Sequence, residues 1–119
     1  MNTDPRSSSQ PLELYQTEWC PASRRVRQRL TELDVTYLVR QVPVEREERL
    51  ELLLRTGADS IPALVSEDGI VVVGEEEILP YLDRRFPEPA GAEAHRLKAT
   101  KARKRELEEA TRCLAPATH

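Results

Sequence analysis

Apolar and polar positions change their period several times between residues 12 and 86, and each period predicts one element. Residues 12–15 alternate apolar and polar positions, which is typical of a short strand. Pro21 then stands where a helix can begin, since proline is favoured at the first helical position. Apolar residues follow it at helical spacing, namely Ala22, Val26, Leu30 and Leu33. The pattern therefore predicts an amphipathic helix that starts beside Cys20.

The middle of the chain predicts a second strand and a second helix. Residues 35–42 are rich in β-branched and aromatic side chains, which favours a strand. Residues 45–56 have a helical pattern, and Gly57 supplies a stop signal after them. We expect the core-facing stripe of this helix to consist of Leu50, Leu53 and Leu54.

The next segment predicts a hairpin and a third helix. Apolar runs at 63–65 and 70–73 flank an Asp-Gly turn, which is a strong signal for two antiparallel strands. A third helical pattern follows and is ended by Pro87. Pro80 is compatible with that helix only if the helix begins near Glu77, where the first N–H groups have no partner to lose.

The element order is therefore β-α-β-α-β-β-α, which we interpret as an α/β fold of the thioredoxin-like type. The first βαβ unit predicts parallel strands and the hairpin adds antiparallel ones, which together give a four-stranded mixed sheet. We expect a flexible leader at residues 1–11, a thioredoxin-like domain at 12–86, a linker at 87–91 and a charged helical tail at 92–119.

The tail has high helix propensity but few apolar positions. Residues 92–113 carry seven basic and four acidic side chains, so the rest of the chain is acidic. Leu97, Leu107 and Leu114 form only a sparse apolar stripe. Three interpretations are open: a helix that lies loosely on the domain, a helix that binds a protein partner, or a frayed end.

Composition and charge narrow the class of protein. The 119 residues are 39% hydrophobic and 33% charged, as expected of one soluble globular domain. The net charge of −3 argues against a nucleic-acid binder, which would show a basic footprint. The longest apolar run is far too short to cross a membrane, and the N-terminus shows no apolar segment of a signal peptide. We expect a cytoplasmic protein that contacts neither membrane nor nucleic acid.

The chain contains two cysteines, Cys20 and Cys113, and we expect both to be free thiols. Cys20 is the candidate for reactivity, because the unpaired N–H groups and positive end of a helix favour thiolate over thiol. Arg24 and Arg25, in the first turn, would add positive potential, or they are ordinary solvated arginines. The alternative for Cys20 is a small buried hydrophobic residue at a helix start.

Three segments resemble the glutaredoxins and the N-terminal domain of glutathione transferases, which shares the same plan. Trp19-Cys20-Pro21-Ala22-Ser23 looks like the active-site turn of glutaredoxins. Ser60-Ile61-Pro62-Ala63-Leu64 looks like the cis-proline segment that faces this turn. Gly74-Glu75-Glu76-Glu77-Ile78, with Tyr81-Leu82, is similar to the acidic turn and last helix of that fold. The resemblance covers about residues 12–86.

The resemblance implies roles for the residues around the thiol. Cys20 matches the nucleophilic cysteine, and Ser23 stands where dithiol members have their second cysteine, so a monothiol mechanism is implied. Cys20 would attack a mixed disulfide and be released by a second small thiol, with Ser23 donating a hydrogen bond to the thiolate. Trp19 and Pro21 would line the groove for the bound thiol; for Trp19 the alternative of an ordinary packing residue is open. Glutathione or another low-molecular-weight thiol would be the co-substrate, protein disulfides would be the partners, and no metal is expected.

The other two segments would bind the small thiol. Pro62 matches the cis-proline, which turns the backbone of Ile61 toward the bound peptide. Glu75, Glu76 and Glu77 stand where relatives hold the amino group of glutathione, with the register open between the first and the last pair. Acidic residues at this place also complement the dipole of the helix that they begin, and both explanations are open.

Three features depart from the family pattern, and one of them is that the Glu-Ser pair of the transferases is absent. Ala22 replaces an aromatic residue, and Thr17 replaces a basic residue before the cysteine. Arg40 or Arg46 would have to supply the missing cation. A small thiol other than glutathione is therefore an open alternative.

The leading hypothesis is a glutaredoxin-like thiol-disulfide oxidoreductase that acts through Cys20. A non-catalytic binding module with the same fold is the main alternative, and an iron–sulfur carrier is a minor one. A complete glutathione transferase is not expected, because the residues after Phe86 are too few to build a helical second domain.

Overall fold

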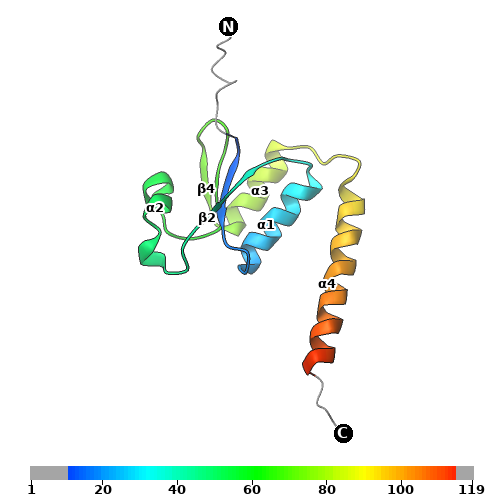
Figure 1. Ribbon diagram of the computed structural model, residues 1–119. Coiled ribbons are helices and arrows are strands. Elements are labelled where there is room, and N and C mark those ends of the chain that lie inside the picture. The colour runs from blue at the N-terminus through cyan, green and yellow to red at the C-terminus, as the bar shows by residue number, and fades with distance from the viewer. Residues whose placement is uncertain (1–10, 115–119) are drawn as a thin grey trace.

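The computed structural model of the chain describes residues 11–114, and Figure 1 shows its arrangement. Residues 1–10 of the expected leader and the last five residues of the expected tail lie outside that range. In chain order the elements are β1 (Glu13–Gln16), α1 (Pro21–Glu32), β2 (Leu38–Gln41), the short 3₁₀ helix η2 (Arg46–Glu48), α2 (Leu50–Thr56), β3 (Ala63–Val65), β4 (Val71–Val73), α3 (Glu75–Arg85) and α4 (Ala92–Leu114).

The four strands form one mixed sheet in the order β2-β1-β3-β4. β1 runs parallel to β2 and antiparallel to β3, with Leu14 opposite Val39 on one side and Leu64 on the other. β3 and β4 are antiparallel, and Gly69 in the turn between them has a φ of 89°, which favours glycine. The predicted α/β fold and its hairpin are confirmed.

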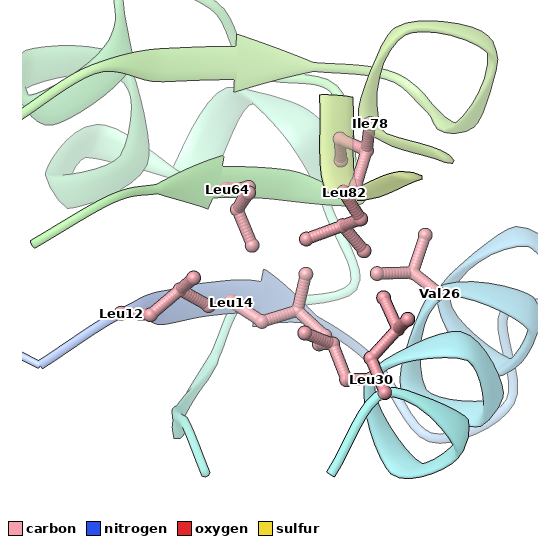
Figure 2. Close-up of a cluster of buried hydrophobic side chains, with 8 residues drawn as sticks. Leu12, Leu14, Val26, Leu30, Leu64, Ile78 and Leu82 are labelled. Atoms are coloured by element: carbon pink, nitrogen blue, oxygen red, sulfur yellow. The ribbon is translucent and has the colours of Figure 1, made fainter. Parts of the chain in front are cut away.

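The main core lies between the sheet and the helices α1 and α3. Figure 2 shows leucines of β1 and β3 meeting apolar side chains of both helices. Val26 and Leu30 of α1 are completely buried, as the helical spacing predicted. The cluster consists of Leu12, Leu14, Val26, Leu30, Leu33, Leu64, Ile78 and Leu82.

The opposite face of the sheet is covered by α2, and here the predicted stripe is wrong. Leu52 is the buried leucine and packs with Tyr15 of β1. Leu50, Leu53 and Leu54 are exposed, the last of them by 87%. The reason is that α2 spans only seven residues and begins after a separate 3₁₀ turn, so a different face meets the sheet.

The helix α3 begins two residues earlier than Pro80 led us to expect. Gly74 precedes it with a φ of 93°, and its carbonyl accepts the N–H of Ile78 at 2.9 Å. Pro80 therefore lies inside the helix, and its missing N–H leaves the carbonyl of Glu76 without a helical partner. The expected start near Glu77 is wrong, because apolar packing of the helix outweighs the loss of one backbone hydrogen bond.

The tail forms a helix, α4, that is held to the body at its N-terminal end by an ionic network. Arg29 of α1 donates to Asp83 at 2.9 Å and to Glu88 at 2.9 Å. Arg96 of α4 donates to Glu88 at 2.5 Å and to Glu32 of α1 at 3.3 Å. Figure 1 shows α4 on the side of α1, away from the sheet. Neither α4 nor any other helix within residues 11–114 has the length and apolarity that a membrane crossing needs.

Candidate thiol site at the start of α1

The strand register gathers the three candidate segments at one end of the sheet. Tyr15, near the end of β1, pairs with Ala63 at the start of β3, and Ala63 pairs with Val73 at the end of β4. The turn after β1, the segment before β3 and the turn after β4 therefore meet. These segments carry all the candidate residues, namely Trp19, Cys20, Pro21, Ser23, Ile61, Pro62, Glu75 and Glu76.

Cys20 is the N-cap residue of α1, which confirms its predicted position. Its backbone is extended (φ −77°, ψ 119°), and Pro21 follows at the first helical position. The sulfur accepts the backbone N–H of Ser23 at 3.4 Å, so it occupies the place of a capping oxygen. The N–H of Cys20 donates to the carbonyl of Thr17 at 3.3 Å. The thiol is thus fixed at the positive end of the helix and is partly exposed.

The surroundings lower the pKa of Cys20. Burial of the thiol opposes this change, since it disfavours the charged form. Hydrogen bonding by Ser23, the backbone N–H of Ala22 and the positive charge of Arg25 outweigh burial, so that the pKa lies below its ordinary value. The thiolate is the nucleophilic form, and the site therefore favours reactivity.

The hydroxyl of Ser23 is fully buried next to this sulfur. Within residues 11–114 its oxygen has no hydrogen-bond partner. A buried hydroxyl without a partner is costly, because its water contacts are lost and not replaced. The Cys20 thiolate can accept a hydrogen bond from this hydroxyl. This agrees with the finding that hydrogen bonding by the Ser23 side chain lowers the pKa of Cys20.

Trp19 and Pro21 flank the thiol on the outside of the fold. The side chain of Trp19 is 63% exposed, so it contributes little to the core. Pro21 is exposed and fixes the first turn of α1. An exposed indole beside a partly exposed thiol is available for contact with a bound molecule.

The peptide bond between Ile61 and Pro62 is cis, as predicted. Pro62 is buried, and its carbonyl accepts the N–H of Gly74 at 2.9 Å. This hydrogen bond ties the segment before β3 to the start of α3. The two segments expected to bind the small thiol are therefore joined directly by a backbone hydrogen bond.

The two candidate carboxylates behave differently. Glu75 pairs with Arg25 of α1, with Nη2 of Arg25 at 3.0 Å from Oε1 of Glu75, and hydrogen bonding by Arg25 lowers the pKa of Glu75. Glu76 is exposed and has no ion pair among the residues the structure describes. Its Oε1 lies only 2.9 Å from the place where a Cβ on Gly74 would stand. Glu76, and not Glu75, is therefore open to an incoming amine.

The candidate cations for a ligand carboxylate already have partners. Arg40 lies 3.1 Å from a carboxylate oxygen of Glu13, and Arg46 lies 2.7 Å from one of Asp59. Arg46 also donates to the hydroxyl of Ser60 at 3.3 Å, beside the cis-proline. Of the two, only Arg46 lies near the candidate site.

Arg49 is a residue of this region that the sequence pattern does not reveal. Its side chain is buried and donates to the carbonyls of Pro43 at 2.8 Å, Val44 at 3.0 Å and Asp59 at 2.9 Å. It joins the loop after β2 to the segment that leads to Ile61. No motif marks such a residue, because its partners are backbone atoms that any sequence provides.

Cys113 is exposed near the end of α4, and both cysteines are free. Within the described range no cluster of three His, Cys, Asp or Glu side chains could hold a metal ion.

Comparisons with known proteins agree with this geometry. Residues 14–90 match the family model of the glutathione S-transferase N-terminal domain. No curated protein sequence matches the chain significantly.

Solved transferases show the same arrangement. A glutathione S-transferase from Rhodospirillum rubrum F11 is 30% identical, with a TM-score of 0.57, and the match covers 66% of this chain and 35% of that one. The rice transferase GST1, solved in complex with glutathione, is 26% identical with a TM-score of 0.58, over 81% of this chain and 45% of that one. A glutathione transferase homologue from Sulfitobacter, solved with bound glutathione, is 23% identical with a TM-score of 0.58, over 69% and 43% of the two chains, and this likeness shows the fold alone.

The chain spans less than half the length of these transferases. The family model, in contrast, covers most of the chain and includes the thiol, the cis-proline and the acidic turn. The chain therefore belongs to the glutathione S-transferase N-terminal domain family.

Proposed function

We propose that this protein is a thiol-disulfide oxidoreductase that removes glutathione from mixed disulfides by a monothiol mechanism. The observation that carries the proposal is the state of Cys20. Its sulfur caps α1, accepts a hydrogen bond from Ser23, is partly exposed and has a lowered pKa. Membership of a glutathione-binding family supports glutathione as the small thiol.

The first step is an exchange between the Cys20 thiolate and a mixed disulfide. The thiolate attacks the glutathione sulfur, a new S–S bond forms between Cys20 and glutathione, and the bond to the substrate sulfur breaks. The substrate leaves as a thiolate and takes a proton from water. Ser23 cannot form a disulfide, so α1 has no second cysteine that could release the adduct from Cys20.

The second step regenerates the thiolate. The thiolate of a second glutathione attacks the glutathione sulfur of the adduct, oxidised glutathione leaves, and Cys20 is again a thiolate. Over the two steps one free glutathione thiol is oxidised and the substrate sulfur is reduced to a thiol, while the glutathione from the mixed disulfide ends as the other half of oxidised glutathione. Hydrogen bonding by Ser23 and the charge of Arg25 make Cys20 a good leaving group in this step, since they stabilise its anion.

The walls of the site would orient the glutathione half of the disulfide. The backbone of Ile61 would pair with the peptide like an added strand, and Trp19 would cover its apolar parts. Glu76 is the carboxylate that would receive the amino group, because Glu75 already pairs with Arg25.

A direct assay of exchange tests the proposal. A peptide with one cysteine in mixed disulfide with glutathione is incubated with reduced glutathione, and release of the peptide thiol is followed by chromatography. We expect the wild type and the matched control Cys113→Ser to accelerate release, whereas Cys20→Ser stays at the uncatalysed rate. Equal acceleration by Cys20→Ser would remove the proposal, and so would a wild type that binds glutathione without accelerating release.

The identity of the small thiol needs a second arm. The same peptide is prepared in mixed disulfide with free cysteine, which lacks the γ-glutamyl and glycyl parts of glutathione. We expect the mixed disulfide with glutathione to react faster than the one with cysteine. In Glu76→Gln the difference between these two rates should be smaller. Faster reaction of the cysteine disulfide would show that another small thiol is the co-substrate.

A further inference from the structure

The outer face of α2 presents three leucines to solvent. Leu50, Leu53 and Leu54 are exposed among the residues that the structure describes, whereas Leu52 packs against the sheet. Positions three and four apart share one side of a helix, so the exposed leucines are neighbours and form one leucine face. Figure 1 shows α2 on the side of the sheet opposite α1 and α3. A group of adjacent exposed leucines is typical of an interaction surface.

The arginines next to the leucine face already have partners. Arg46 lies 2.7 Å from a carboxylate oxygen of Asp59, and Arg55 lies 3.0 Å from one of Glu13. Arg49 is buried and donates to three backbone carbonyls. These are all the basic residues of η2, α2 and the turn between them. The positive charges of this segment are therefore directed to the protein itself.

The glutamates of the same segment are, in contrast, available to a partner. Four of them are exposed and form no ion pair within the part of the chain that the structure describes, namely Glu45, Glu47, Glu48 and Glu51. Glu51 lies three positions before Leu54, which makes the two neighbours on the helix surface. The other three glutamates lie just before the first turn of α2. The leucine face therefore has an acidic border.

We propose that the leucine face binds a basic amphipathic helix of another protein. The apolar side of that helix packs on the three leucines, and the lysine or arginine side chains beside it meet the acidic border. Burial of the leucines supplies affinity, and the opposite charges select the partner. The leucine face shares no residue with the thiol site, so the proposal does not depend on the chemistry of Cys20.

The form of the surface favours a helix over an extended strand as the partner. A strand gains most of its affinity from main-chain hydrogen bonds to the open edge of a sheet. The backbone of α2 offers no such edge, because its hydrogen bonds are made within the helix. Side chains three and four apart form a ridge, and a ridge of this kind packs into the groove between the side-chain rows of a second helix.

Other occupants match the leucine face less well. The acidic border repels anionic lipids and nucleic acids. Two copies packed through this face would bring like charges together. In α4 the basic block at residues 98–105 has alanines but no larger apolar side chain, so it lacks an apolar side. Residues 1–10 and 115–119 contain one arginine and no lysine, so neither has the required charge.

Binding of designed peptides to the full chain tests the proposal. The probe is a synthetic helical peptide with leucines on one side and lysines elsewhere, and its binding is measured by calorimetry. Two comparison peptides are a shuffled sequence of the same composition and the same leucine pattern with glutamate in place of lysine. We expect only the first peptide to bind. Failure of the first peptide to bind, or equal binding of either comparison peptide, would overturn the proposal.

Matched pairs of leucines locate the bound peptide. Leu50→Gln/Leu54→Gln removes apolar contacts without adding charge, and should raise the dissociation constant at least about tenfold. The control is Leu107→Gln/Leu114→Gln on α4, which should leave the constant unchanged. The control residues are 60% and 82% exposed, compared with 63% and 87% for the pair on α2. Urea denaturation verifies that both variants are folded, and equal effects of the two pairs would contradict the assigned face.

Matched charge reversals test the acidic border. Glu48→Lys/Glu51→Lys should weaken binding of the leucine–lysine peptide at least about fivefold and make it less dependent on salt. Glu108→Lys/Glu109→Lys changes the net charge of the protein by the same amount on α4, and should have little effect. If both variants weakened binding equally, the peptide would respond to net charge and the role of the border would be wrong.

Two further measurements test the occupants that the charges disfavour. Sedimentation equilibrium of the wild type would reveal a dimer, and vesicles of phosphatidylserine would reveal membrane binding. We expect neither to depend on the leucine face. A dimer that Leu50→Gln/Leu54→Gln dissociates would assign the face to a second copy, and vesicle binding lost in the same variant would assign it to a membrane. Either result would overturn the proposal.

Discussion

Arg25 of α1 forms a two-pronged ion pair with Glu75, the first residue of α3, although the two are 50 positions apart. Arg25 also lowers the pKa of Cys20 through its charge, so one side chain links the thiol to the acidic turn. The pair holds the guanidinium in place near the sulfur. It also removes Glu75 from the carboxylates that a ligand could use.

Replacing Arg25 should make the thiol less reactive. Arg25→Gln removes a positive charge that favours the thiolate and leaves the negative charge of Glu75 unpaired. We expect the pKa of Cys20 to rise and alkylation by iodoacetamide at neutral pH to slow. Rates measured across a pH series give the shift directly. Arg84→Gln, in the last turn of α3, serves as the control and should leave the profile unchanged.

Ser23→Ala should separate reactivity from stability. The hydroxyl lowers the thiol pKa, so its loss should raise that pKa, although the backbone N–H of residue 23 still donates to the sulfur. Because the hydroxyl has no other partner within the described range, the free energy of unfolding should stay within about 1 kcal/mol of wild type. Alkylation rates and urea denaturation measure the two effects. If the free energy of unfolding fell by several kcal/mol while the pKa of Cys20 stayed unchanged, Ser23 would have a purely structural role.

Two leucines of α2 should differ sharply in their contribution to stability. Leu52 is 1% exposed and Leu54 is 87% exposed. Leu52→Ala should lower the free energy of unfolding by about 2–5 kcal/mol, since it leaves a cavity against Tyr15. Leu54→Ala should change it by less than about 0.5 kcal/mol. Urea denaturation of the two variants measures both changes. A larger loss of stability for Leu54→Ala than for Leu52→Ala would instead favour the helix face that the sequence pattern predicts.

Glu13 should make part of the stability depend on pH. Its side chain is fully buried, and the carboxylate accepts from Arg55 at 3.0 Å and from Arg40 at 3.1 Å. Burial opposes ionisation, but these arginines outweigh it and lower the pKa of Glu13 below the ordinary 4.5. A lowered folded-state pKa means that the ion pairs stabilise the fold above pH 4.5, and that this stability is lost as the pH falls through the folded-state pKa.

Glu13→Gln should therefore lower the free energy of unfolding by about 2 kcal/mol at pH 7. The decrease should become smaller as the pH falls below about 4.5. The free energy of unfolding is measured in urea from pH 7 to pH 3. For Glu47→Gln, on the exposed 3₁₀ turn, the free energy of unfolding should change with pH in the same way as that of the wild type over this range. A cost for Glu13→Gln that does not change with pH would contradict the role given to its charge.

Local signals in the sequence determined the order and type of the elements and the place of the thiol. Proline at the first helical position and the apolar spacing after it fix where α1 begins, and Cys20 stands directly before that point. The Asp-Gly turn fixes the hairpin in the same way. Such signals act within one or two turns of the chain, so they can be interpreted without knowing what the element packs against.

Tertiary structure alone decided which surfaces and charges meet. Leu52 faces the sheet because α2 begins only at Leu50 and has about two turns against the sheet. The spacing of the leucines does not reveal where the helix begins. Arg49 binds backbone carbonyls, and the partner of Glu75 is an arginine in a distant helix. These contacts depend on how close two segments come after the core has formed, and no short-range pattern carries that information.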